Sequence, residues 1–538
     1  MREQAREPVL HFEILCMTLF SATREIPEDI TSVCPSGEIY EVSENLADSP
    51  YFNPDIAPTP RSGRRWGVLD FAALWIGMCA CIPTYMIASS LIAEGMNWWQ
   101  AILTITLANT IILIPMILNA HAGTRYGISF PVYCRASFGI RGANIPAVLR
   151  ALVACGWFGI QTWIGGEALF RIMAVLFPSL GNWPSTFLSI SVPQLICFLF
   201  FWAINMFVIY MGIESIRILL NIKAPLLIML GLLLLAWAYF RAHGFGPMLS
   251  QPSAFAAGGP KAGQFWLFFP AALTGMIGFW ATLSLNIPDF SRYAYSQKSQ
   301  VIGQILGLPT TMALYSFIGV AVTSATIVIY GQAIWDPIAL LTRFTNPVVL
   351  VIAMFSLCIA TLGTNIAANV VSPANDFSHL APRFISFRTG GLITGLIGIA
   401  IQPWKLIADP SGYIFKWLVA YSALLGAIGG ILIVDYCFIR RGRIDLAGLF
   451  RQSGPYWYQR GFNFRAIIAL VLGIAPCAPG FLGTVGLIHA APIFMELYNY
   501  AWFISLGISG GVYALLMLPG SKQIREPDFS PQRHNDTT

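Results

Sequence analysis

The sequence predicts an all-α integral membrane protein with twelve membrane-spanning helices. Its 538 residues are 56% hydrophobic and only 10% charged, whereas about a quarter of the residues in a soluble domain are charged. The apolar residues gather in runs of about 20 residues or more, the length needed to cross a bilayer. The net charge of +6 lies in short loops between these runs, so it does not indicate a nucleic-acid partner.

Twelve apolar runs meet the length of a membrane span. They cover residues 68–93, 98–120, 144–176, 191–213, 220–240, 264–287, 302–330, 347–372, 389–407, 411–438, 464–486 and 491–518. The third run is too long for an upright crossing, so we expect it to be tilted or to begin in the interface. In this scheme residues 1–60 form an N-terminal tail, 61–520 the membrane domain and 521–538 a C-terminal tail.

Lysine and arginine are distributed unevenly between alternate loops. One side collects Arg61, Arg64, Arg65, Arg125, Arg135, Arg141, Arg217, Arg292, Lys298, Arg383, Arg388, Arg440, Arg441, Arg443, Lys522 and Arg525. The opposite loops hold little beyond Arg241, Lys261 and Arg343. By the positive-inside rule both termini are cytoplasmic. Residues 11–20 are too short to span and contain Glu13, so we expect no signal peptide; a translation start at Met17 or later is an alternative.

The first span is a poor straight helix. Gly77 and Pro83 lie inside it, with Cys79 and Cys81 between them. A proline removes one backbone donor and collides with the carbonyl four residues back. Membrane proteins tolerate such a break where the freed backbone faces protein or a water-lined cavity. The break therefore indicates a substrate or ion site at the midplane, or else a plain proline kink.

The third span carries the first candidate site residues. Trp157 and Gln161 are four residues apart and share one helix face. Glu167 follows in the same span, and an intramembrane glutamate is costly unless it is paired or protonated. It has a functional role or lies in the interface at the outer end of a tilted helix. The segment 123–146, with three arginines and repeated glycines, predicts a cytoplasmic interfacial segment.

The sixth and eighth spans add aromatic and polar candidates. Gly278 beside Trp280 allows close backbone approach next to a flat ring, although a tryptophan that only packs is the alternative. Asp289 and Arg292, near the cytoplasmic end, suit an ion pair or a helix cap. The eighth span has a polar stripe at helical spacing, formed by Thr361, Thr364, Asn365, Asn369 and Ser372. This stripe suits an ion and an amide-bearing substrate, or hydrogen bonds between helices.

Sequence motifs of enzymes and ATP-driven pumps are missing from the chain. It has no Walker loop, HExxH or GxSxG motif, and no CxxC pair or Cys/His cluster. Most of its ten cysteines lie inside apolar spans, where they act as small packing residues. We therefore expect neither an enzyme nor a metal cofactor. A passive channel remains the other class to exclude, since a channel gives uptake without accumulation.

Eight motifs, in this order, resemble the nucleobase:cation symporter-1 family over residues 51–450. They are NPDIAPT at 53–59, IPTY at 82–85, GISFP at 127–131, SFGIRG at 137–142, GWFGIQTW at 156–163, NIPDF at 286–290, TNIAAN at 364–369 and QPW at 402–404. The resemblance implies a LeuT-like fold: inverted repeats of five helices each, at about 68–240 and 264–438, with two additional helices at 464–518. Helices 1 and 6 of such a fold are broken.

The resemblance also implies a substrate site. Trp157 and Trp280 match the two tryptophans that sandwich a planar heterocycle in the family. Gln161 and Asn369 match amides that hydrogen-bond its ring N–H and C=O groups. At the helix 1 position that supplies an amide in several relatives, this chain has Cys81. Phe279 stands where a relative has glycine, which narrows the expected pocket.

The family's cation site corresponds here to the carbonyls of Gly77, Ala80 and Ala360 and to the hydroxyl of Thr364. A second hydroxyl of the family pattern is replaced by Gly363, which weakens a sodium site. The coupling ion is thus sodium or a proton, and Glu167 is the candidate proton carrier. No further cofactor is expected.

The resemblance is strongest to bacterial members close to the plant plastidic nucleobase transporter branch. Those plant relatives have glutamate where this chain has Gln161, whereas the hydantoin and allantoin branch has glutamine. We therefore expect a cell-membrane symporter that imports a nucleobase (uracil, cytosine or a purine), with allantoin or hydantoin as the alternative. The expected partners are this small molecule and the lipid bilayer, and the transporter is expected to act as a monomer.

Overall fold

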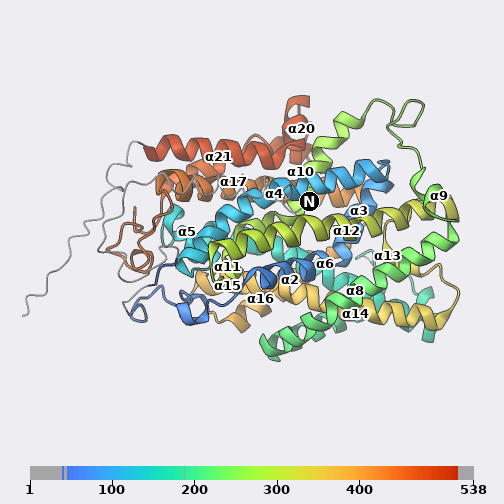
Figure 1. Cartoon of the computed structure of the whole chain (residues 1–538), viewed down its shortest axis with the longest axis horizontal. Coiled ribbons are helices and arrows are strands. Elements are labelled where there is room, and N and C mark those ends of the chain that lie inside the picture. The colour runs from blue at the N-terminus through green and yellow to red at the C-terminus, as the bar shows by residue number, and fades with distance from the viewer. Residues whose placement is uncertain (1–38, 42–44, 187, 212, 519–538) are drawn as a thin grey trace, which may run out of the picture.

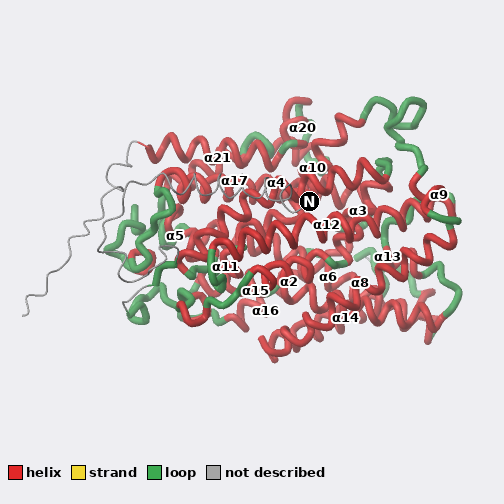
Figure 2. Tube along the Cα trace, viewed as in Figure 1, coloured by secondary structure: helices red, strands yellow, loops and turns green. Residues whose placement is uncertain are grey.

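The computed structural model describes residues 39–41, 45–186, 188–211 and 213–518. Helices run mostly along the long axis of the molecule, and loops gather at its two ends (Figures 1 and 2). Expectations about residues 1–38 and 519–538, including the 11–20 segment, the translation start and the C-terminal tail, lie outside the described residues. The all-α membrane fold is confirmed.

The helices follow the expected spans closely. The first half of the described chain forms α2 (Val68–Cys79), α3 (Ile82–Ala93), α4 (Trp98–Tyr126), α5 (Phe130–Phe138), α6 (Asn144–Leu176), α7 (Val192–Met211), α8 (Ile213–Arg241) and α9 (Phe245–Leu249). The second half forms α10 (Phe265–Asn286), α11 (Pro288–Ser291), α12 (Gln297–Tyr330), α13 (Pro337–Leu341), α14 (Pro347–Asn369), α15 (Val371–Leu380), α16 (Phe387–Ala400), α17 (Val419–Ile433), α18 (Phe464–Ile474), α19 (Ala478–Thr484), α20 (Pro492–Asn499) and α21 (Ala501–Met517). Short π-helical segments, Gly412–Leu418 and Val434–Ile439, extend α17 at both ends.

Ten spans follow from length and hydropathy in the described chain if each bent helix pair is counted once. The bent pairs are α2 with α3 (57°), α18 with α19 (43°) and α20 with α21 (88°). Two shorter apolar helices, Pro225–Arg241 and Phe387–Ala400, coincide with the expected fifth and ninth spans. The number twelve therefore stays a prediction. In the last pair a right angle separates the helices, so α20 does not lengthen the crossing made by α21.

Two groups of helices pack against each other to form the bundle. In the first group, α12 contacts α2, α3 and α4, and α4 also contacts α10. In the second group, α6 is surrounded by α7, α14, α15 and α16. Beside them α17 and α21 form a further layer, drawn orange and red along one edge of Figure 1. One large apolar core runs through the first group and α17. The interface between the two groups is therefore the natural place for an internal site.

The expectation of an interfacial segment at 123–146 is wrong. Its first residues continue α4, and every residue of α5 is buried. The apolar residues of α5 belong to the main core, and Arg135 is only 1% exposed. Hydrogen bonds from its guanidinium to the backbone oxygens of Tyr51 and Leu449 satisfy part of this group within the protein. The segment is thus a structural helix inside the bundle.

The end of the expected N-terminal tail is packed against the bundle. Asn53 is 3% exposed, and its side-chain amide donates to the carbonyls of Pro382 and Ile385 beyond α15. Arg64 is also 3% exposed and donates to the carbonyls of Thr59 and Arg125, among others. Backbone carbonyls that accept from buried polar side chains fix this segment in one place.

A buried ion pair ties α6 to α15. Arg150 donates to Asp376 over 2.7 Å, and both side chains are fully buried. On the neighbouring α11, Asp289 accepts from the backbone N–H of Phe130, the first residue of α5. Asp289 therefore caps a helix, as one of the two sequence interpretations expected. The helix that it caps comes from a distant part of the chain.

The Arg150–Asp376 pair is expected to be critical for stability. Asp376→Leu leaves a buried, unpaired guanidinium, so the variant should lose about 3–5 kcal/mol, whereas the double variant Arg150→Met/Asp376→Leu should recover most of this loss. Thermal unfolding of the purified protein in detergent measures both. Lys261→Gln, which breaks the partly exposed pair with Glu94, serves as the control and should cost at most about 1 kcal/mol. Equal unfolding temperatures for Asp376→Leu and the unmodified protein would contradict the assignment.

Candidate functional site

A small cavity, called the central cavity below, lies between the two helix groups at the break in the first span. All six residues expected to bind substrate line it: Cys81, Trp157, Gln161, Phe279, Trp280 and Asn369. Thr364, expected at the cation site, lines it as well. The cavity volume is about 30 Å³. The structure therefore brings the candidates together around one small cavity.

The break in the first span is sharper than a proline kink. Ala80 ends α2, and Cys81 has extended backbone, with φ −151° and ψ 159°. Pro83 lies in the first turn of α3, where a proline costs no hydrogen bond because the first N–H groups of a helix have no intrahelical partner. Two helices thus meet at 57°, and residues on both sides of the break, Met78 and Pro83, line the cavity.

The expectation that the sixth span is broken at a position matching the break in the first span is wrong. Helix α10 is continuous past Gly278 and ends at Asn286, and Pro288 begins the short α11. A glycine inside a helix costs only about 1 kcal/mol, which is too little to open a packed helix. A Cβ atom on Gly278 would lie 2.6 Å from the carbonyl oxygen of Leu418. This glycine therefore serves close packing of α10.

Three aromatic rings meet along one side of the cavity. Phe279 contacts Trp157 with ring centroids 5.3 Å apart, and it contacts Trp280 at 4.8 Å, both edge to face. The indole N–H of Trp157 donates to the hydroxyl of Tyr421, 3.2 Å away. Trp280 also packs edge to face on Trp75. Phe279 thus touches both tryptophans that the sequence analysis assigned to a stacking pair.

Polar groups in the cavity wall divide into satisfied and unsatisfied ones. Gln161 Oε1 and Trp280 Nε1 are buried and have no hydrogen-bond partner in the described structure. Leaving a buried donor or acceptor unmade costs about 1–3 kcal/mol, so these two atoms are ready to bind a ligand. In contrast, Asn369 donates to Asn365, whose own amide donates to the side chains of Thr162 and Asn205. This chain of amides holds Asn369 in place.

The expected cation ligands lie on both sides of the same interface. Thr364 donates to the carbonyl of Ala360 over 3.1 Å, so these two candidates are already in contact within α14. Ala80 is fully buried at the end of α2, and Gly77 is half-buried one turn earlier. Thr361, next to Ala360, has a buried hydroxyl oxygen with no partner in the part of the chain described.

Glu167 forms an ion pair on its own helix. Its carboxylate lies 2.6 Å from the guanidinium of Arg171, one turn further along α6, and accepts from the amide of Gln194 at 3.0 Å. Glu167 does not line the cavity. The sequence analysis did not identify Arg171 as a partner, although its i,i+4 spacing is a readable signal.

Several lining residues were missed from the sequence. Met78, Pro83, Thr282, Leu283 and Ala368 complete the wall. Thr282 and Ala368 follow Trp280 and Thr364 within about one helical turn, so helical spacing could have indicated them. Met78 and Leu283 carry no such signal, because an apolar residue in an apolar span is typical of any lipid-facing or packing position.

Comparison with known proteins gives consistent matches. A family profile described as "Permease for cytosine/purines, uracil, thiamine, allantoin" matches residues 58–505. The purine-uracil permease of Arabidopsis thaliana is 45% identical over 492 residues, covering 89% of this chain and 80% of the relative. The allantoin permease of Bacillus subtilis (strain 168) is 40% identical over 469 residues, covering 86% and 93% respectively.

A solved structure matches over nearly its full length. It is that of a nucleobase-cation-symport-1 family transporter in a closed conformation with bromovinylhydantoin bound, with a TM-score of 0.72, 26% identity, and coverage of 89% of this chain and 98% of the other. A sodium-coupled sialic acid symporter, 14% identical with a TM-score of 0.57, shows the shared fold alone. The chain is therefore a multi-pass membrane permease with a LeuT-like fold, not an enzyme, and it belongs to the nucleobase:cation symporter-1 family.

Proposed function

We propose that this permease imports a nucleobase by symport with a cation, by alternating access around the central cavity. One observation carries the proposal: the cavity is walled by α2, α3 and α10 from one helix group and by α6 and α14 from the other. Movement of one group against the other opens such a site to either side of the membrane.

A flat heterocycle with alternating donors and acceptors fits the wall chemistry. Aromatic faces stack on planar rings, the amide of Gln161 offers a free acceptor, and the indole of Trp280 offers a free donor. A base between Trp157 and Trp280 needs the ring of Phe279 to swing away, since that ring contacts both. The higher identity to a purine-uracil permease than to an allantoin permease supports a nucleobase. Allantoin or hydantoin is the second candidate substrate, because Gln161 matches the residue type of the hydantoin and allantoin branch at this position.

The coupling ion is proposed to bind where α2 and α14 face each other. Gly77, Ala80 and Ala360 offer carbonyls there, and Thr364, with Thr361 as a further ligand, offers hydroxyls. Oxygen ligands of this kind suit a hard cation such as sodium. If a proton is the coupling ion instead, Glu167 is the proposed carrier. No other cofactor is proposed.

The proposed location is the cell membrane, with both termini cytoplasmic and the α5 end of the bundle facing the cytoplasm. The excess of arginine in the loops at that end supports this orientation. In this scheme residues 1–60 and 521–538 are cytoplasmic, and 61–520 form a transporter that acts as a monomer.

Uptake measurements test the proposal directly. Cells that express the chain should accumulate radiolabelled uracil, and adenine or cytosine should compete more strongly than allantoin or hydantoin. Accumulation should collapse on sodium removal or on addition of an uncoupler, whichever ion is coupled. Uptake without accumulation would indicate a channel. Uptake of labelled allantoin but not of uracil would show that the substrate is a ureide and not a nucleobase.

Removing either stacking ring should weaken substrate binding. Trp157→Ala and Trp280→Ala should each lose about 1–3 kcal/mol, the value of one base–aromatic stack, which is roughly a 5- to 150-fold rise in Kd. Equilibrium binding of labelled substrate to purified protein measures this. Trp99→Ala, at a position that is 49% exposed, is the control and should bind normally. Near-normal affinity in both stacking variants would rule out the sandwich.

Asn369→Ala should weaken binding roughly tenfold, because it leaves a buried group of the substrate without its hydrogen bond. The control is Asn109→Ala, which removes a buried amide that donates to Ile105 within α4, away from the cavity. Competition binding with a series of unlabelled bases measures both variants. If Asn369→Ala and Asn109→Ala have the same affinity as the unmodified protein, Asn369 does not contact the substrate.

Glu167→Gln separates binding from coupling. Because Glu167 lies outside the cavity, the variant should bind substrate normally but fail to accumulate it if this carboxyl carries the proton. Glu94→Gln, which removes a carboxylate paired with Lys261, is the matched control. Full accumulation by the Glu167→Gln variant would show that its pair with Arg171 is structural only.

A further inference from the structure

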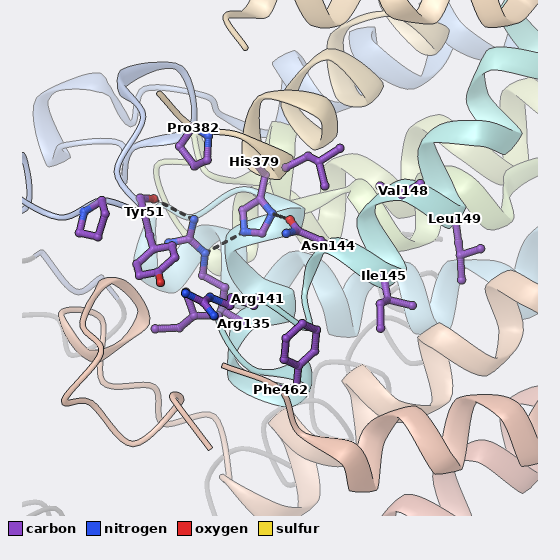
Figure 3. A pocket seen from close by; sticks show the side chains of 13 residues that line it. Tyr51, Arg135, Arg141, Asn144, Ile145, Val148, Leu149, His379, Pro382 and Phe462 are labelled. Carbon is purple, nitrogen blue, oxygen red and sulfur yellow. Dashed lines mark hydrogen bonds between the residues drawn. The ribbon is translucent and has the colours of Figure 1, made fainter. Parts of the chain in front are cut away.

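A second and much larger cavity lies near α5, apart from the proposed substrate site. Its volume is about 600 Å³. The wall is formed by Tyr51, by α5, by the start of α6, by the end of α15 and by Phe462 (Figure 3). None of its lining residues is shared with the central cavity, and none of them is acidic.

Arg135 places a positive charge in the wall, where its guanidinium lies over the ring of Phe450 at 4.7 Å and no lining residue is acidic. Its guanidinium donates to the carbonyls of Tyr51 (3.0 Å) and Leu449 (3.2 Å) and to Nε2 of His379 (2.8 Å). Because that nitrogen accepts, the proton of His379 is on Nδ1, which donates to Asn144 Oδ1 at 2.7 Å. The imidazole in this arrangement is neutral. Figure 3 shows the resulting chain of side chains along the cavity wall.

The charge of Arg135 is therefore uncompensated within the described chain. The residue is 1% exposed, and no carboxylate pairs with it there. Burial lowers the pKa of Arg135 to about 9. A buried charge without a counter-charge is costly, so an anion in the cavity would stabilise this arrangement.

Arg141 adds a second guanidinium from the loop between α5 and α6. It stacks over the ring of Trp457 at 5.1 Å, and it is exposed. Stacking leaves the edge of the Arg141 guanidinium available for hydrogen bonds to a phosphate. Arg135 uses three of its five N–H groups in the hydrogen bonds above, so one N–H on each terminal nitrogen is left for a ligand. Arg135 and Arg141 both line this cavity (Figure 3).

The opposite part of the wall is apolar. Ile145, Val148 and Leu149 are half-buried on one face of α6. One turn further along the same face, Leu152 is 41% exposed, so the apolar strip continues out of the cavity along the surface of a membrane-spanning helix. A small water-soluble anion gains nothing from contact with an apolar strip, whereas an acyl chain that lies along the strip buries apolar surface.

We propose that this cavity binds an anionic phospholipid, with its phosphate between Arg135 and Arg141 and an acyl chain along Ile145, Val148 and Leu149. Basic pockets between membrane helices are a recognised way to hold lipid head groups. The bound lipid compensates the charge of Arg135 and joins α5, α6 and α15 at this end of the bundle. The site is independent of the substrate that the permease carries.

Native mass spectrometry of the purified full-length protein tests the proposal. Dioleoyl-phosphatidylglycerol should bind in a one-to-one complex at a concentration at least fivefold below that needed for dioleoyl-phosphatidylcholine. Arg141→Gln, an exposed change that spares folding, should weaken phosphatidylglycerol binding at least fivefold. Val148→Trp should do the same by filling the apolar strip. Lys298→Gln removes an exposed charge from the start of α12, and its binding should be unchanged.

Three results would overturn the proposal. The first is equal binding of the two lipids, and the second is equal loss in Lys298→Gln and Arg141→Gln. The third is displacement of phosphatidylglycerol by millimolar inorganic phosphate, which would identify the ligand as a soluble anion. Failure of substrate transport has no bearing on these measurements, because they read lipid binding alone.

Discussion

The extended backbone at Cys81 is the constraint on which the rest of the architecture depends. A membrane span that stops being helical must keep its backbone away from lipid, because hydrocarbon offers no hydrogen bonds. In this protein α12 packs along both α2 and α3, α4 contacts α3, and α14 contacts α2 from the second helix group. From α10, Trp280 packs on Trp75 of α2. The same arrangement that shelters the break also places Trp157, Gln161 and Asn369 opposite it. The packing that shelters the broken helix is therefore the same packing that forms the candidate substrate site.

The small size of the central cavity follows from how its wall is filled. The ring of Phe279 occupies the space beside Trp157 and Trp280, and polar atoms on Gln161 and Trp280 remain unmatched. An incoming ring of similar shape can replace the contacts of Phe279 and also supply the missing hydrogen bonds. The ring contacts made by Phe279 are thus of a kind that a flat heterocycle can replace with its own.

Local sequence periodicity predicted most of the helices and the residues of the candidate site. The remaining features depend on packing between residues that are far apart in the chain. Apolar length located α6 and α14, and the four-residue spacing of Trp157 and Gln161 placed both in one wall. Sequence alone could not show that α10 stays helical past Gly278, since this depends on the close approach of Leu418. It also could not show that Asp289 caps α5 or that Arg135 is buried beside His379, because these partners are far apart in the chain.

A structure of the full chain with uracil bound tests the central claim most directly. The account predicts the base between the rings of Trp157 and Trp280, hydrogen-bonded to Gln161 and Asn369, with the side chain of Phe279 rotated away from both tryptophans. Density for the base elsewhere, with Phe279 still in contact with both indoles, would contradict it.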